Sequence, residues 1–372
     1  MSSRVVIWRL TWLPFSETFI RNHVNSLQAW EPVCVGVATK RSAIASPTDQ
    51  VLYSASLLDR VLRQLLIKTG WSRRLEKFLA EGEFDLVHAH LGNDAVVVAL
   101  ACRRLGLPLI VTLHGIDVSS MANRSGLRGA IYRCRLRRTL QGAAAVIAVS
   151  DYIAQRALVL GATNGNTVVH YSGIPLSPLP HLITDPRFDV LFVGRLVEKK
   201  GVADLIRAVS IIQNKYAERV SVTIVGSGPL ENALTSLAAE ESVDALFLGA
   251  RSSHDVAELM RRSKIIAVPS VTAADGDTEG LPTVICEAAA ASRPVIGYAH
   301  SGIAEGVVHG ETGLLCNEHD IEGLAENIHI ALQDRHLRDE LGKSARVRAE
   351  KLFDISKQVL RLEAIYNSAK SA

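Results

Sequence analysis

The 372-residue sequence contains no stretch typical of a membrane span, a signal peptide or a cysteine framework. No apolar run approaches the roughly 18 residues that a membrane-spanning helix needs. The five cysteines are odd in number and have no C-x-x-C spacing, so they indicate neither a disulfide framework nor a zinc site; they are Cys34, Cys102, Cys134, Cys286 and Cys316. The first ten residues enter a strand-like run without the apolar core of a signal peptide. We therefore expect a cytosolic protein with reduced thiols.

Charge is unevenly distributed along a chain whose net charge is only +3. Residues 1–182 carry 20 Lys and Arg against 11 Asp and Glu, whereas the remainder carries 21 against 27. Two predicted helices concentrate the basic residues: one holds Arg124, Arg128, Arg133, Arg135, Arg137 and Arg138, and the other holds Arg60, Arg63, Lys68, Arg73, Arg74 and Lys77. Only Tyr132 and Trp71 are available there for base stacking, so we do not expect nucleic-acid binding.

The second of these basic helices also repeats apolar residues at helical spacing: Leu57, Leu58, Val61, Leu62, Leu65 and Leu66. An apolar stripe beside basic residues suits an anionic membrane surface. The same pattern is typical of a helix that covers the sheet of an α/β domain. Both interpretations stay open from the sequence. The first predicts a peripheral protein on the inner face of the cell membrane.

Short β-branched runs alternate with helical patterns in two sets, separated by a proline-rich connector over residues 175–180. Runs of the first set lie at 5–10, 33–37, 86–90, 109–114, 146–150 and 168–171, and those of the second at 190–194, 222–226, 246–249, 265–269 and 295–298. Continuous apolar strands separated by helices indicate parallel sheets that are covered on both faces. We predict an α/β protein of two doubly wound, Rossmann-like domains, residues 1–177 and 178–353, whose parallel sheets face a central cleft.

A single glutamate interrupts an otherwise small or apolar helix predicted over residues 283–292. A buried carboxylate needs a partner, and sugar or ribose hydroxyls would suit Glu287. Pro282 fits the first helical turn, whose free N–H groups would bind an anion behind Gly280 and Leu281. Glu279 lies just before this turn. The segment predicts a nucleotide-sugar site; the alternative is a buried helix whose glutamate forms an incidental salt bridge.

Two cations follow the first strand of the second set. Arg195 comes directly after the strand and Lys200 precedes Gly201, so both project from one loop and could neutralise a diphosphate without a metal. Lys199, between them, is expected to face solvent. The alternative is a solvated basic loop. Gly226 and the Gly249–Arg251 turn end neighbouring strands, where they could line a nucleotide or serve only as turns.

The first half offers polar residues at its own strand ends. His114 is the best candidate for a histidine facing a donor sugar, although a lone histidine at a strand end is more often structural. His90 is expected to line the cleft and His88 to be a satisfied core histidine. Ser16 could cap a helix beginning near Glu17. The turn at residues 15–18, which ends at Thr18, could also present Glu17 to an acceptor hydroxyl; capping alone is the equal alternative. Asp275 and Asp277 have the spacing of a metal-binding pair, but chance is the favoured explanation.

Four motifs taken together resemble glycosyltransferase family 4: Gly-Arg-Leu-Val-Glu-Lys-Lys-Gly (194–201), Gly-Ser-Gly-Pro (226–229), Glu279-x7-Glu287 and His300-Ser-Gly-Ile-Ala-Glu with Gly310-Glu-Thr-Gly-Leu-Leu. The run at 13–20 and the Asp275-Gly-Asp-Thr-Glu-Gly segment resemble the bacterial exopolysaccharide branch of colanic acid and amylovoran transferases. The chain departs from the common pattern where Ser16-Glu17-Thr18 replaces a Gly-Gly pair, and where Ala304 replaces proline.

This resemblance implies a GT-B fold, a nucleotide-sugar donor, retention of anomeric configuration and no essential metal or cofactor. It implies that Arg195 and Lys200 hold the diphosphate, Glu279 the sugar hydroxyls and Glu287 the ribose, with backbone N–H groups from Gly280 to Thr283 reaching sugar and phosphate. His114 matches the histidine near the donor sugar. A final helix over residues 354–372 is expected to cross back to the first domain.

The sequence therefore predicts a membrane-associated transferase that moves a hexose from a UDP- or GDP-linked donor to a lipid-linked saccharide. Two alternatives stay open. A nucleotide-sugar epimerase or hydrolase on the same fold would act on the donor alone. A non-catalytic nucleotide-sugar-binding regulator would bind donor without turning it over.

Overall fold

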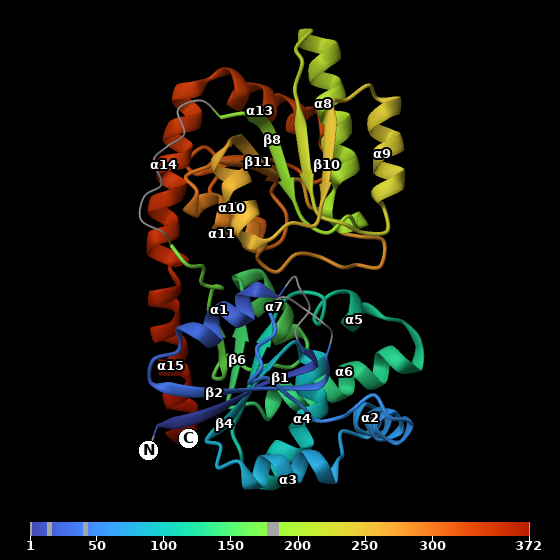
Figure 1. Cartoon of the computed structure of the whole chain (residues 1–372), viewed down its shortest axis with the longest axis vertical. Helices are drawn as coiled ribbons and strands as arrows, with labels where there is room; N and C mark the ends of the chain where they lie inside the picture. Colours follow the sequence, from blue (N-terminus) through green and yellow to red (C-terminus); the bar gives the residue numbers. More distant parts are fainter. Residues whose placement is uncertain (1, 13–16, 40–43, 177–185, 372) are drawn as a thin grey trace. The chain divides into compact units, whose positions relative to one another are not determined.

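A computed structural model describes residues 2–12, 17–39, 44–176 and 186–371. The chain forms two compact units, one made of Met1–Gly173 with Ile355–Ala372 and the other of Ile174–Asp354. In each unit, helices flank a sheet (Figure 1). The last helix, α15 (Ile355–Ser371), belongs to the first unit, where it packs against α1 (Thr18–Ser26).

The first unit is built on a parallel sheet with the strand order β3-β2-β1-β4-β5-β6-β7 among the described residues. Its strands are β1 (Ser3–Trp12), β2 (Trp30–Thr39), β3 (Gln50–Val51), β4 (Leu86–His90), β5 (Leu109–Leu113), β6 (Ala145–Ala148) and β7 (Thr167–Val169). Its other helices are α2 (Leu57–Thr69), α3 (Arg73–Glu81), α4 (Gly92–Leu105), α5 (Ser120–Asn123), α6 (Gly126–Gln141) and α7 (Asp151–Val159).

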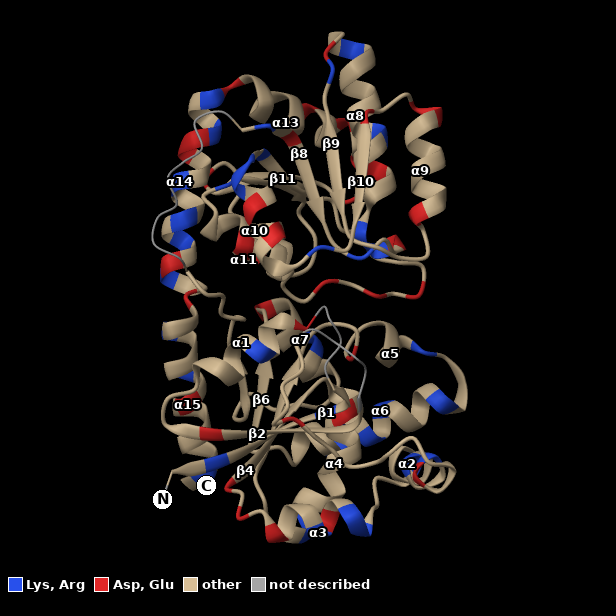
Figure 2. Cartoon of the chain, in the orientation of Figure 1, with Lys and Arg blue, Asp and Glu red and all other residues tan. Residues whose placement is uncertain are grey.

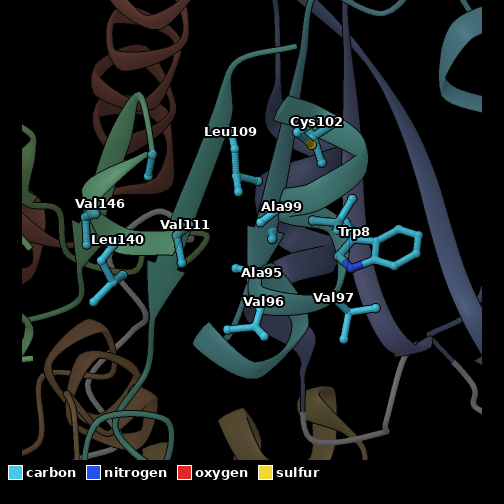
Figure 3. Packing of buried hydrophobic residues seen from close by; sticks show 14 of the residues in the cluster. Trp8, Ala95, Val96, Val97, Ala99, Cys102, Leu109, Val111, Leu140 and Val146 are labelled. Atoms are coloured by element: carbon cyan, nitrogen blue, oxygen red, sulfur yellow. The ribbon is translucent and has the colours of Figure 1, made fainter. Parts of the chain in front are cut away.

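Both faces of this sheet are covered, which explains the continuous apolar strands. Successive side chains of a strand point to opposite faces. Val6 and Trp8 of β1 join the core that includes α4, whereas Val5 and Ile7 join the core that includes α1 and α15. Figure 3 shows the first of these cores, with Trp8 near the small side chains of α4. All five residues of β5 are buried, as expected for a central parallel strand.

The second unit has a parallel sheet in the order β10-β9-β8-β11-β12-β13 among the described residues. Its strands are β8 (Phe188–Val193), β9 (Val222–Val225), β10 (Ala245–Gly249), β11 (Ser263–Val268), β12 (Val295–Tyr298) and β13 (Gly313–Cys316). Its helices are the short 3-10 turn η1 (Glu198–Lys200), α8 (Val202–Tyr216), α9 (Glu231–Glu240), α10 (Ser253–Arg261), α11 (Thr283–Ala290), α12 (Ile303–Gly306), α13 (Ile321–Gln333) and α14 (Arg335–Leu352).

The predicted fold class, two doubly wound units with parallel sheets, is confirmed. In the second unit, Val190 and Phe192 of β8 pack toward α8 and α13, whereas Leu191 packs toward α10 and α11. The sheet order changes direction between β8 and β11, which is the switch point where such sheets bind ligands beyond their strand ends. Within the described part of the chain, every helix is too short or too polar to span a bilayer.

Candidate active site

Glycines let three strand-end loops of the second unit approach one another. A Cβ atom on Gly226 would lie 1.8 Å from the carbonyl oxygen of Gly194, and one on Gly228 would lie 2.4 Å from that of Leu196. Gly226 donates its N–H to the carbonyl of Gly249, which has φ +67°. The loops after β8, β9 and β10 therefore pack backbone against backbone, and only glycine fits at Gly226.

The η1 turn carries the predicted lysine to a buried carboxylate. Lys200 Nζ lies 2.9 Å from Glu279 Oε1, with both side chains largely buried. Burial alone would raise the pKa of Glu279, but the charges of Lys200, Lys199 and, least, Arg195 outweigh it and lower that pKa. Arg195 itself is exposed, and it takes part in none of the ion pairs of the described residues. The site thus combines an ionised glutamate with three cations.

The expectation that Lys199 faces solvent is wrong. Its exposed fraction is 9%, and its Nζ lies 2.9 Å from Asp277 Oδ2. Nζ also donates to the carbonyl of Thr278 at 3.4 Å. The reason is that the loop between β11 and α11 packs against η1, where Val271 donates its N–H to the carbonyl of Lys199. Asp277 of the Asp-x-Asp pair is therefore a partner of a lysine.

Helix α11 begins at Thr283, so Pro282 takes the N-cap position, one residue before the predicted first turn. Gly280, Leu281 and Pro282 are buried and Thr283 is half-buried. The first N–H groups of a helix have no partner within it, so this end can bind an anion. Arg251 is exposed after β10, and among the described residues its guanidinium donates only to the neighbouring carbonyl of Ala250, at 3.4 Å.

Glu287 lies in the body of α11, and its carboxyl group takes part in no hydrogen bond or ion pair within the described part of the chain. Burial raises the pKa of this carboxyl group to about 7. The alternative of an incidental salt bridge at Glu287 therefore has no support in the described residues. A carboxyl group in this state can accept hydroxyl hydrogen bonds from a ligand.

In the first unit, β4 and β5 bring two predicted histidines together. His90 Nδ1 lies 3.2 Å from His114 Nε2, and the rings stack with centroids 5.5 Å apart. Phe19 of α1 lies against His114, with ring centroids 4.8 Å apart. Burial lowers the pKa of His114 to about 3, with smaller effects of Arg9 and His23, and it also lowers that of His90. Both imidazoles are neutral at physiological pH.

His88 is a satisfied core histidine. Its Nδ1 and Nε2 atoms lie 2.6 Å from the hydroxyls of Tyr366 and Thr112, respectively. Tyr366 comes from α15, so this buried contact also ties the C-terminal helix to the sheet of the first unit. His88 has no ring nitrogen left for a ligand.

A buried arginine that the sequence patterns did not single out connects the acceptor-side candidates. Arg9 of β1 is 4% exposed; its Nε donates to Glu17 Oε2 at 3.0 Å and its Nη1 to Asp94 Oδ2 at 2.7 Å. Nη1 also donates to the carbonyl of His90 at 2.9 Å. The signal was available, because Arg9 is the charged residue inside the apolar run 5–10. Its partners, however, come from distant loops.

The start of α1 differs from the predicted cap. The helix begins at Thr18, and the N-cap position is Glu17. Ser16, the predicted cap, lies outside the described residues. Because Arg9 forms an ion pair with Glu17, this carboxylate is fixed beside the ends of β1 and β4.

No group of three or more His, Cys, Asp or Glu side chains suited to a metal ion occurs among the described residues.

Comparison with known proteins identifies the family. The family model described as glycosyl transferases group 1 matches residues 178–348, and the one described as glycosyltransferase family 4 matches residues 16–178. The chain is 30% identical over 288 residues to the putative colanic acid biosynthesis glycosyltransferase WcaL of Escherichia coli, covering 75% of this chain and 69% of the relative. It is 36% identical over 138 residues to the amylovoran biosynthesis glycosyltransferase AmsK of Erwinia amylovora, covering 37% of this chain and 34% of AmsK.

The fold is shared with a solved structure. Anabaena Alr3699/HepE, crystallised in complex with UDP and glucose, superposes with a TM-score of 0.77 at 20% identity, covering 99% of this chain and 100% of that one. At this identity the likeness concerns the fold alone. Taken with the two family models and the similarity to WcaL, these findings show that the chain belongs to glycosyltransferase family 4 and is a glycosyltransferase with the GT-B fold.

Proposed function

We propose that this enzyme transfers a hexose from a UDP- or GDP-linked donor to a lipid-linked or saccharide acceptor in bacterial surface polysaccharide synthesis, with retention of configuration. The main observation behind this proposal is the Lys200–Glu279 ion pair, in which a cation and an ionised carboxylate lie 2.9 Å apart just before α11. The similarity to WcaL and AmsK, glycosyltransferases of colanic acid and amylovoran biosynthesis, supports the polysaccharide role. The donor class is supported by HepE, which shares the fold and was crystallised with UDP and glucose.

The diphosphate is assigned to the cationic side of the site. Arg195 and Lys200 would bind its oxygens together with the N–H groups that begin α11, so charge on the leaving group is stabilised without a metal or other cofactor. Gly226, Gly249 and Arg251 end the neighbouring strands and are assigned to the nucleotide. Glu287 would accept the ribose hydroxyls, because its carboxyl group has no partner in the described residues.

Transfer breaks the bond between the anomeric carbon and the diphosphate oxygen, which keeps the electron pair. The acceptor oxygen forms the new bond on the same face, and its proton passes to the departing phosphate oxygen. Glu279 would hold the donor-sugar hydroxyls, and neutral His114 would hydrogen-bond the sugar as well. Glu17, Thr18, Ser16 and His90 are assigned to the acceptor side.

A thermal-shift panel of UDP- and GDP-sugars in excess EDTA tests the donor assignment. A bound donor at about 100 times its dissociation constant should stabilise the protein by roughly 2.7 kcal/mol. Consumption of the donor should then depend on an added lipid-linked saccharide acceptor and should continue in EDTA. Donor breakdown or epimerisation at the same rate without acceptor would favour the epimerase or hydrolase alternative, and binding without turnover would favour a regulator.

The membrane assignment comes from a surface that we call the α2–α6 face. Its exposed apolar residues are Leu57, Leu58, Val61, Leu65, Trp71, Leu127 and Ile131. The apolar residues of α2 do not all face the core: Leu66 is buried there, whereas Leu57 and Leu58 are 78% and 68% exposed. A helix that only covers a sheet would turn this stripe inward. The outward apolar residues are therefore available to a partner.

The two helices of this face adjoin, because Arg135 of α6 donates to the carbonyl of Lys68 at the end of α2 at 3.1 Å. Six arginines and no acidic residue lie between Asp117 and Asp151, and five basic residues and no acidic one between Asp59 and Glu76. Figure 2 shows Lys and Arg residues on α2, α3 and α6. Positive charge around exposed leucines suits an anionic lipid surface. We assign the enzyme to the cytoplasmic face of the cell membrane on this basis.

Vesicle sedimentation tests this assignment. The protein should bind vesicles that contain phosphatidylglycerol, bind pure phosphatidylcholine weakly, and be partly released by added salt. Leu57→Ser with Leu58→Ser and Val61→Ser should reduce binding by about tenfold or more. The matched control, Val159→Ser with Val347→Ser and Leu360→Ser, removes equally exposed apolar side chains elsewhere and should change nothing. The membrane assignment would be contradicted if both triple variants lost vesicle binding equally, or if the protein bound RNA and not vesicles.

A further inference from the structure

Three consecutive residues of η1 hold the loop between β11 and α11 at successive points. Glu198 Oε1 accepts the N–H of Ala274 at 3.1 Å. Lys199 accepts the N–H of Val271 on its carbonyl at 2.8 Å and reaches farther along the loop with its side chain. Lys200 reaches Glu279, at the end of the same loop. The loop has no regular secondary structure of its own, so these contacts fix its course.

Lys199 has the strongest hold on the part of the loop next to Glu279. Its ammonium group lies 2.9 Å from Asp277 Oδ2 and 3.4 Å from the carbonyl of Thr278, the two residues that precede Glu279. The side chains of Lys199 and Asp277 are only 11% and 13% exposed. By comparison, those of the surface pair Lys77–Glu81 are 71% and 67% exposed. A buried ion pair constrains its loop far more than an exposed one, because removing one partner leaves a desolvated charge.

The two lysines have different freedom to move. Lys200 has Glu279 as its ion-pair partner among the described residues, and the proposed diphosphate would attract the same ammonium group. Lys199 is held by a carboxylate and a carbonyl that do not belong to the ligand-binding set. Lys200, Lys199 and Arg195 are the cations that lower the pKa of Glu279. If Lys200 and Arg195 engage a diphosphate, Lys199 is the member of this set that stays on the loop, held at the two residues before Glu279.

We propose that Lys199 is a positioning residue for donor-sugar recognition: it fixes Glu279 through Asp277 and the Thr278 carbonyl and supplies the positive charge that stays with Glu279 when Lys200 engages the diphosphate. This inference rests on the proposed function. It gives Asp277 the role of anchoring Lys199, and it gives the two lysines of the Lys-Lys-Gly motif different roles: Lys199 positions Glu279, and Lys200 binds the diphosphate.

The test compares Lys199→Met, Lys199→Arg and Asp277→Asn in the full chain. Donor KM and kcat/KM are measured from about pH 5 to about pH 9, and the affinity for the nucleoside diphosphate without sugar is measured by calorimetry. In Lys199→Met we expect donor KM to rise about tenfold and the acidic limb of kcat/KM to move up by about one pH unit, since Glu279 loses a counter-charge. Nucleoside diphosphate affinity should stay within about twofold.

Matched variants separate positioning from general damage. Lys199→Arg keeps the charge and should restore the pH profile, and Asp277→Asn should raise donor KM with a smaller pH effect. Lys264→Met removes another ion pair of this unit, Lys264 Nζ to Asp189 Oδ1 at 2.8 Å, and should leave both readouts unchanged. An unshifted pH profile and unchanged donor KM in Lys199→Met would overturn the proposal.

Two other outcomes also distinguish a positioning role of Lys199 from other roles. If Lys199→Met does not fold, an Asp277→Asn variant with wild-type donor KM overturns the proposal, and one with raised donor KM but normal nucleoside diphosphate affinity supports it. If Lys199→Met loses nucleoside diphosphate affinity as strongly as donor affinity, Lys199 contacts the diphosphate itself and the positioning role is wrong. Failure of the proposed function is read separately, as absence of transfer by the wild-type protein with every nucleotide-sugar tried.

Discussion

Lys200 Nζ lies 2.9 Å from Glu279 Oε1, so the cation that we assign to the diphosphate is held by the carboxylate that we assign to the sugar. The pair sets up a competition. A nucleotide-sugar must draw the ammonium group toward its phosphates while giving the carboxylate hydroxyl partners in return. A nucleoside diphosphate without sugar takes the cation and offers the carboxylate nothing.

This competition predicts opposite effects of two substitutions on nucleoside diphosphate binding. Glu279→Gln releases Lys200 from its ion pair, so UDP or GDP should bind as tightly as to the wild type or a few-fold more tightly. Transfer should nevertheless fall about 100-fold, because a charged hydrogen-bond acceptor for the sugar is lost. Calorimetry and a transfer assay measure the two effects.

Lys200→Ala is the comparison for that experiment, since it should weaken nucleoside diphosphate binding and transfer together, each by about tenfold or more. If Glu279→Gln weakened UDP or GDP binding as much as Lys200→Ala does, the carboxylate would be helping the diphosphate site and the competition would be absent.

Glu287 gives a prediction that couples stability to pH. Burial raises the pKa of this carboxyl group from its ordinary value of 4.5 to about 7, so the folded state retains a proton that the unfolded state has already lost between these pH values. Stability therefore falls as pH rises through this window, and the full penalty is present above pH 7. Glu287→Gln removes the penalty. Its melting temperature should match the wild type near pH 4.5 and exceed it by a few °C at about pH 8.

The same variant should bind nucleotide about tenfold more weakly above pH 7, because an amide with one acceptor oxygen replaces a carboxylate with two acceptor oxygens for ribose hydroxyls. Differential scanning calorimetry and nucleotide titration check the two effects on one protein sample. Glu240→Gln, an exposed change in the last turn of α9, serves as the control and should alter neither. A Glu287→Gln protein that is less stable than the wild type at about pH 8 would show that the carboxylate is satisfied in the free enzyme.

The fold could be predicted from the sequence because a local pattern determines it. Five consecutive apolar or β-branched residues over Leu109–Leu113 are all buried, and such runs separated by helices leave few arrangements other than a parallel sheet covered on both faces. Strand ends were less certain. The run at 146–150 continues past the strand, since β6 ends at Ala148 and Ser150 instead caps α7 through the N–H of Ile153. An apolar pattern does not distinguish the last ladder residue from the turn that follows.

The site could be predicted only in part, because its remaining features depend on directions and distant partners. The cations at Arg195 and Lys200 follow from their place after a strand, but the direction of Lys199 depends on how the loop after β11 packs against a 3-10 turn. Arg9 similarly finds Asp94, 85 residues away, and no local pattern links the two. A charged residue inside an apolar strand signals a buried partner without naming it.

Gly226 should tolerate no side chain. An alanine Cβ at this position would lie 1.8 Å from the carbonyl oxygen of Gly194, with φ at +137°. Because the contact is to backbone, β8 or β9 must shift, and we expect Gly226→Ala to destabilise the second unit by about 3 kcal/mol or more. Nucleotide binding should weaken as well. Urea unfolding, followed with and without nucleotide, measures both effects.

Gly310 supplies the control for backbone strain without a clash. It has φ +76° and open space around its missing Cβ, so Gly310→Ala should cost only about 1 kcal/mol. Equal destabilisation by the two substitutions would mean that the close approach at Gly226 contributes nothing beyond its backbone conformation.

Arg9 should be essential to the first unit, because it neutralises two carboxylates away from solvent. Its guanidinium bonds Glu17, Asp94 and the carbonyl of His90, and burial raises the pKa of Asp94 to about 7 even beside this cation. Arg9→Met removes the charge but keeps apolar bulk, and we expect a loss of about 3–5 kcal/mol in the free energy of unfolding. The loss should grow as pH rises above about 7, because Asp94 then ionises beside Arg9 in the wild type but has no counter-charge in the variant, and it should level off below about 7, where Asp94 is protonated in both proteins. Adding Asp94→Asn to Arg9→Met should recover part of the stability at about pH 8.

The control is Arg74→Met. Arg74 forms an ion pair with Asp59, but its side chain is exposed, so its loss should cost less than about 1 kcal/mol. Urea unfolding at two pH values resolves these effects; an Arg9→Met loss that does not depend on pH would mean that packing of the side chain, and not its charge, stabilises the end of β1.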